Sequence, residues 1–85
     1  MNNKLEIFKK KLIYRAGYRG TKEMDILLSS FVNKYIDKFD NMYLTELENF
    51  LNFDDETILN FYNNGEVSKE IDKNKISTIF KDFKI

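Results

Sequence analysis

The segment 15–25 holds the densest group of side chains suited to specific polar contacts. Arg19 and Glu23 stand four residues apart in it. On a helix that begins near Arg19 they are neighbours, and we expect them to form an ion pair on the face that carries Ile26. An exposed isoleucine beside an ion pair indicates a contact surface for a partner. The alternative is an ordinary surface ion pair, worth about 0–1 kcal/mol.

Gly20 lies between these two charged residues. The helical pattern places it near the core-facing side, where a missing side chain lets another backbone approach closely. That backbone would come from the first helix or from a partner. The alternative is a glycine that only marks a helix boundary.

The composition excludes two of the side chains that enzymes commonly use in catalysis. The 85 residues contain no cysteine, histidine, tryptophan or proline. Without cysteine there is no thiolate metal site, and without histidine there is no serine–histidine triad. We therefore expect one domain, residues 1–85, that binds or assists another protein and is not an enzyme. The acids of segment 54–56 are interpreted as helix caps rather than a cation site.

The net charge of zero conceals an uneven distribution. Residues 1–22 carry a charge of +6, residues 23–56 carry −7, and residues 57–85 carry +1. Either the oppositely charged segments attract each other within the fold, or they dock a charged partner. The run Lys9–Lys11 also supports an alternative function, a small regulatory or antitoxin-like protein that binds nucleic acid. The lack of net positive charge argues against nucleic acid as a partner.

Helical periodicity runs through the whole chain. We expect a compact all-α bundle of five helices in a single domain. The first helix is expected at about 3–16, the second from 20 or 21 to 39, and the third at about 41–52. The fourth helix is expected to follow the acids of segment 54–56 directly and to end at Gly65. A fifth helix is expected at about 69–83, capped by Ser68. No apolar run is long enough to cross a membrane.

Two blocks of this sequence resemble the SdhE-type assembly factors of succinate dehydrogenase. The first block runs from Lys11 to Leu28 and contains the motif R-G-x-x-E, here Arg19, Gly20 and Glu23, followed by an acid and aliphatic residues. The second block, from Phe50 to Phe61, resembles the family segment L-L-x-x-D-x-x-L-x-x-W. The resemblance covers about residues 8–65 and implies a five-helix bundle.

The resemblance also implies a function. The family takes part in covalent attachment of FAD to the flavoprotein subunit of succinate dehydrogenase, and in bacteria also of fumarate reductase. The flavoprotein is then the partner, and FAD is the cofactor of that client; we expect no cofactor bound tightly by this chain. The implied partner-binding residues are Arg19, Gly20 and Glu23, flanked by Arg15, Tyr18 and Asp25.

Other expectations follow from the same resemblance. The family attaches flavin to a histidine of the enzyme, and this chain has no histidine. It therefore cannot be the acceptor and would act on the partner. We expect a monomer in the bacterial cytoplasm; a mitochondrial presequence is disfavoured by Glu6 and by the lack of serine near the start. Two departures concern contacts in the fourth helix: Phe61 replaces the family tryptophan, and Glu56 replaces a frequent proline.

Overall fold

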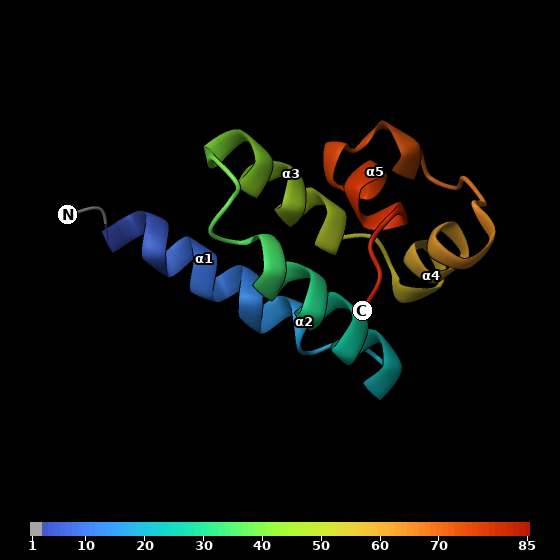
Figure 1. Ribbon diagram of the computed structural model, residues 1–85, viewed down its shortest axis with the longest axis horizontal. Helices are drawn as coiled ribbons and strands as arrows, with labels where there is room; N and C mark the ends of the chain where they lie inside the picture. Colours follow the sequence, from blue (N-terminus) through green and yellow to red (C-terminus); the bar gives the residue numbers. More distant parts are fainter. Residues whose placement is uncertain (1–2) are drawn as a thin grey trace.

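A computed structural model describes residues 3–85 as five α-helices and one 3₁₀ turn, without a strand among these residues. The helices are α1 (Asn3–Ala16), α2 (Lys22–Tyr35), α3 (Asn41–Leu51), α4 (Asp55–Asn64) and α5 (Lys75–Lys81), and the 3₁₀ turn spans Ile71–Lys73. The expectation of an all-α, single-domain bundle is confirmed. Helices α1 and α2 lie side by side, and α3 packs against both α1 and α5 (Figure 1).

The core is a continuous cluster in which aromatic rings hold the centre. The ring of Phe31 lies 5.1 Å from that of Phe80 and 5.3 Å from that of Phe83, edge to face in both pairs. Phe50 lies 6.4 Å from the same ring. Such pairs add about 0.5–1.5 kcal/mol beyond the burial of their area. This cluster fastens α2 to α3 and to the C-terminal segment.

Capping residues define where most helices begin and end. Asp40 and Asp54 accept hydrogen bonds from the backbone at the starts of α3 and α4, as the sequence predicts. Gly65 ends α4 in the left-handed conformation, with φ of 66°. Its N–H donates to the carbonyl of Phe61, the 5→1 bond of the αL motif, and the next N–H donates to the carbonyl of Asn60.

Two predicted helices are shorter in the structure. The second helix ends at Tyr35 rather than Phe39, because the chain turns there and the N–H of Lys38 donates to the carbonyl of Tyr35. The expected fifth helix at 69–83 begins only at Lys75. Its cap is Asn74, not Ser68: the Asn74 side chain accepts from the N–H of Ile76 and of Ser77.

The oppositely charged segments meet within the fold. Lys9 forms an ion pair with Asp37 at 3.2 Å, and Lys11 lies 3.8 Å from Glu48. Two lysines of the basic run therefore face acids of the second segment, which reduces the free positive charge that a nucleic acid would require. Within residues 3–85, no helix is long and apolar enough to cross a membrane.

Candidate partner-binding site

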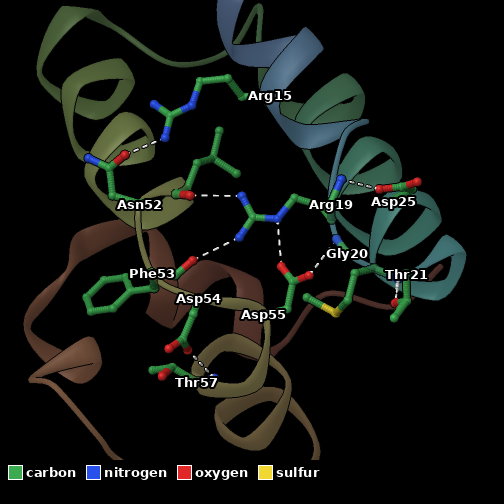
Figure 2. A network of polar contacts seen from close by, with 12 residues as sticks. Arg15, Arg19, Gly20, Thr21, Asp25, Asn52, Phe53, Asp54, Asp55 and Thr57 are labelled. Carbon is green, nitrogen blue, oxygen red and sulfur yellow. Dashed lines mark hydrogen bonds and ion pairs between the residues drawn. The ribbon is translucent and has the colours of Figure 1, made fainter.

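Arg19 joins two loops that are distant in the sequence (Figure 2). Its guanidinium donates through Nη1 to the carbonyl of Leu51 and through Nη2 to the carbonyl of Phe53, each at 2.8 Å. Its Nε donates to Oδ1 of Asp55, also at 2.8 Å. The side chain is only 10% exposed. Arg19 therefore holds the loop before α2 against the turn between α3 and α4.

The local sequence explains why a guanidinium fits at this point. The last carbonyls of a helix have no partner within it, and that of Leu51, the last residue of α3, accepts from Arg19. The carbonyl of Phe53, in the turn that follows α3, accepts from the same guanidinium. Asp55 lies in the first turn of α4, where the helix dipole favours a carboxylate. The planar fork of arginine reaches all three acceptors at once, which the single ammonium of lysine does not.

Gly20 completes this network from the backbone. Its N–H donates to Oδ2 of Asp55 at 2.8 Å, so the Asp55 carboxylate accepts hydrogen bonds from both Gly20 and Arg19. A Cβ on Gly20 would lie 3.0 Å from that same oxygen. The prediction that Gly20 faces the core and admits another backbone is wrong. Gly20 is exposed, and the atom that approaches it belongs to a carboxylate.

The predicted ion pair between Arg19 and Glu23 is also wrong. Helix α2 begins at Lys22, because Thr21 takes the N-cap position and accepts from the N–H of Met24 at 3.2 Å. Arg19 therefore precedes the helix and turns inward. Its own N–H donates to the carboxylate of Asp25, which ties the loop to the first turn of α2.

Glu23 remains on the outer face of α2. Its side chain is exposed and has neither an ion pair nor a side-chain hydrogen bond among the described residues. Ile26, one turn further on, is 50% exposed, as the sequence predicts. Glu23 and Ile26 thus form an exposed surface next to the loop that these hydrogen bonds hold.

The remaining predicted site residues lie around the same loop. Tyr18 is 72% exposed and stacks on Tyr14, with ring centroids 4.4 Å apart. Arg15 donates through its guanidinium to the side chain of Asn52. The structure thus separates the six residues: Tyr18, Gly20 and Glu23 are accessible, whereas Arg19, Asp25 and Arg15 bind groups of this chain.

Sequence reasoning missed Asp55 as a member of this site, since its position fits a helix start equally well. The signal was present in the second block of the family resemblance, which includes Asp55. The two carbonyl acceptors carry no side-chain signal at all. Phe61, which replaces the family tryptophan, is 3% exposed and belongs to the core, with Nζ of Lys81 5.7 Å from the centre of its ring.

Asp54, beside Asp55, has the perturbed carboxyl group of the region. A hydrogen bond from Lys69, at 2.8 Å, and those from Thr57 hold the pKa of Asp54 well below its ordinary value of 3.8. Asp54 is thus a charged helix cap at neutral pH. No cluster of three or more acids suited to a metal ion occurs in residues 3–85, and the chain has no histidine or cysteine to form one.

Comparisons with known proteins give matches to one family. A family model described as the flavinator of succinate dehydrogenase matches residues 10–84. The chain is 46% identical over 39 residues to succinate dehydrogenase assembly factor 2-B, mitochondrial, of Drosophila ananassae. It is 50% identical over 36 residues to assembly factor 2-A, mitochondrial, of Drosophila mojavensis. No solved structure matches the chain.

These matches cover a limited part of each curated relative. The first spans 46% of this chain and 24% of the relative, and the Drosophila mojavensis match spans 42% and 23%. The chain thus matches about a quarter of the length of these relatives. The expected bacterial cytoplasmic location is contradicted, because all three relatives are mitochondrial proteins of flies.

Proposed function

Because the chain belongs to the family of the flavinator of succinate dehydrogenase, we propose that it binds the flavoprotein subunit of that enzyme and promotes covalent attachment of FAD to it. The observation that carries this proposal is the family match, which extends over residues 10–84. The R-G-x-x-E motif lies within the matched range and organises the site described above.

The proposed role is that of an assembly chaperone rather than an enzyme. The chain holds no histidine, so a flavin linkage to histidine must form on the client. A chaperone promotes this step by binding one conformer of the client more tightly than the others and raising its population. That conformer would hold FAD beside its acceptor, while the flavin supplies the reactive group and this chain binds no FAD tightly.

The geometry supports two different roles for the residues of the motif and its neighbours: some hold the loop, and others are accessible to the client. Arg19, Asp25 and Asp55 hold the loop before α2, and the accessible groups that meet the client are Tyr18, Gly20 and Glu23. A preorganised loop loses little conformational entropy on binding, which favours affinity. We propose that the protein is a monomer alone and forms a one-to-one complex with the flavoprotein in mitochondria.

The proposal is tested by producing the flavoprotein subunit in cells with and without this protein. Covalent flavin is measured as fluorescence of the denatured subunit, and complex formation by size-exclusion chromatography. We expect a one-to-one complex and more covalent flavin when the protein is present. Equal covalent flavin in the two cultures, with no complex, would refute the proposed function.

A further inference from the structure

A groove lies between α2 and α4, directly beside the motif. It has a volume of about 290 Å³ and is lined by Glu23, Ile26, Leu27, Leu59, Tyr62, Asn63 and Ile85. Its lining is mostly apolar, and its floor includes Leu27, which is 5% exposed. The walls are anchored: the hydroxyl of Tyr62 donates to the carbonyl of Phe83 at 2.6 Å. Glu23 therefore belongs both to the motif and to a preformed apolar groove.

The groove also presents unsatisfied apolar surface. Ile26 is 50% exposed and Ile85 is 77% exposed, and both lie at the groove. Apolar area left in water favours a partner that covers it, by about 25 cal/mol for each Å² removed from water. The volume of the groove is at the lower end of the range of ligand pockets, roughly 300 Å³, and is large enough for a protein side chain.

The charge beside the groove selects the occupant. Glu23 lines it, and Glu56 lies one turn before Leu59 on α4. Both acids are exposed and have no side-chain partner among residues 3–85. A dinucleotide would bring its phosphates toward these carboxylates, whereas a lysine or arginine of a protein segment would be attracted to them.

We propose that this groove receives one aliphatic or aromatic side chain of the client flavoprotein, on a segment that places a lysine or arginine beside Glu23. The inference rests on the proposed function and adds to it the chemistry of the contact. The Arg19 network positions the groove, since it holds the start of α4 against the loop that leads into α2.

Two aspartate variants test the apolar part of the contact. Ile26→Asp places a charge in the groove, and Ile7→Asp, on α1, is the matched control because Ile7 is an exposed helical isoleucine outside the groove. Binding to the purified flavoprotein is measured for both, after circular dichroism has shown that both fold. We expect Ile26→Asp to raise the Kd about tenfold or more and Ile7→Asp to leave it nearly unchanged.

Glu23→Gln tests the charged part. We expect it to weaken binding about three- to tenfold at low salt, with a smaller loss at about 0.5 M salt, where exposed charges are screened. A photo-crosslinking residue in place of Leu59 identifies the occupant directly. The crosslinked client peptide should contain an apolar residue with a lysine or arginine close to it.

The results separate this inference from the proposed function. If the unaltered protein binds the flavoprotein while Ile26→Asp binds equally well, the groove assignment is wrong and the proposed function survives. An equal loss in Ile7→Asp, or a crosslink from position 59 to a second copy of this chain, also overturns the assignment. If the unaltered protein does not bind the flavoprotein, the proposed function itself fails.

Discussion

Arg19 is the residue on which the geometry of the candidate site depends. Three acceptors from the turn between α3 and α4 converge on its guanidinium, and its own N–H donates to Asp25. A nearly buried charge is stable only when its donors are satisfied. We infer that the arginine of the motif shapes the contact surface from within, and that Glu23 and Gly20 present it to the client.

Replacing Arg19 by lysine should therefore destabilise the fold even though the charge is kept. Lysine leaves at least one buried acceptor unpaired, and we expect a loss of about 2–3 kcal/mol in the free energy of unfolding. Arg15→Lys, at the other arginine of the chain, is the control, and about 0.5 kcal/mol is expected there. Urea unfolding measures both; an Arg19→Lys variant as stable as the unaltered protein would show that Arg19 does not hold the loops.

Gly20→Ala should weaken the same network from the other side. The new Cβ would lie 3.0 Å from Oδ2 of Asp55. The carboxylate cannot move away without breaking its hydrogen bond with Arg19 or with the Gly20 N–H. We expect a loss of about 1 kcal/mol or more in the free energy of unfolding.

Gly17→Ala is the matched control for Gly20→Ala. Its Cβ would lie 3.3 Å from the hydroxyl oxygen of Ser29, a single side chain that can shift slightly. Reduced entropy of the unfolded chain offsets this crowding, so we expect a change near zero. If thermal unfolding shows the two variants equally affected, close contact with Asp55 is not what requires glycine at position 20.

At this scale the sequence singles out residues for the candidate site but does not predict their partners within the fold. Spacing and family resemblance pointed to Arg19, Gly20 and Glu23. The i, i+4 rule then paired Arg19 with Glu23, because a pattern within one segment contains no information on contacts made by folding. Asp55 lies 36 positions from Arg19, so only the tertiary structure reveals their ion pair.

At the scale of elements, capping chemistry decides how well helix ends can be predicted. Asp40, Asp54 and Gly65 were recognised because each has a strong intrinsic preference for its cap position. The start of α5 was placed too early, because the helical apolar pattern continues upstream through Ile71. Ile71 is fully buried, but it lies in the 3₁₀ turn that precedes α5 and not in the helix itself.

Asn74→Ala tests the observed start of α5. The Asn74 side chain accepts two backbone hydrogen bonds and donates to the carbonyl of Glu46 at 3.0 Å, and the residue is 8% exposed. We expect a loss of about 2 kcal/mol in the free energy of unfolding. Asn33→Ala, on the exposed face of α2, is the control and should change it by less than about 0.5 kcal/mol. Similar values for the two variants in denaturant titrations would argue against the cap.

The cap of α4 should make stability depend on acid pH. The pKa of Asp54 is lower in the folded state than its ordinary value of 3.8. The charged carboxylate of Asp54 therefore contributes fully to stability at pH values above 3.8. This contribution is lost as the pH falls through the lower pKa of the folded state. Asp54→Asn keeps a capping oxygen but removes the charge. We expect the variant to be less stable than the unaltered protein at neutral pH, with the gap narrowing below about pH 4.

Lys69→Met provides the internal control for this pH dependence. Lys69 supplies the main hydrogen bond that lowers the pKa of Asp54. In the Lys69→Met background, the difference between aspartate and asparagine at position 54 should therefore shrink at neutral pH. Thermal unfolding at several pH values measures all four proteins. A gap that persists unchanged in acid would contradict the assigned role of the Asp54 charge.

At the scale of the whole molecule, contacts within the chain neutralise only part of the uneven charge. Lys9 and Lys11 face Asp37 and Glu48 at the surface, so opposite charges from the two segments attract each other within the chain. Glu23 remains unpaired at the groove. The sequence predicted the all-α bundle from periodicity. It did not reveal the groove, because leucines and a tyrosine that line a groove resemble core residues in any helical pattern.

We propose that this protein accelerates the attachment of flavin to another polypeptide. The most direct measurement is reconstitution: purified succinate dehydrogenase flavoprotein lacking flavin is mixed with FAD, with or without this protein, and covalent flavin fluorescence is followed over time. We expect faster attachment with the unaltered protein than without it, and slower attachment with Ile26→Asp than with Ile7→Asp. Identical time courses with and without the unaltered protein would contradict it.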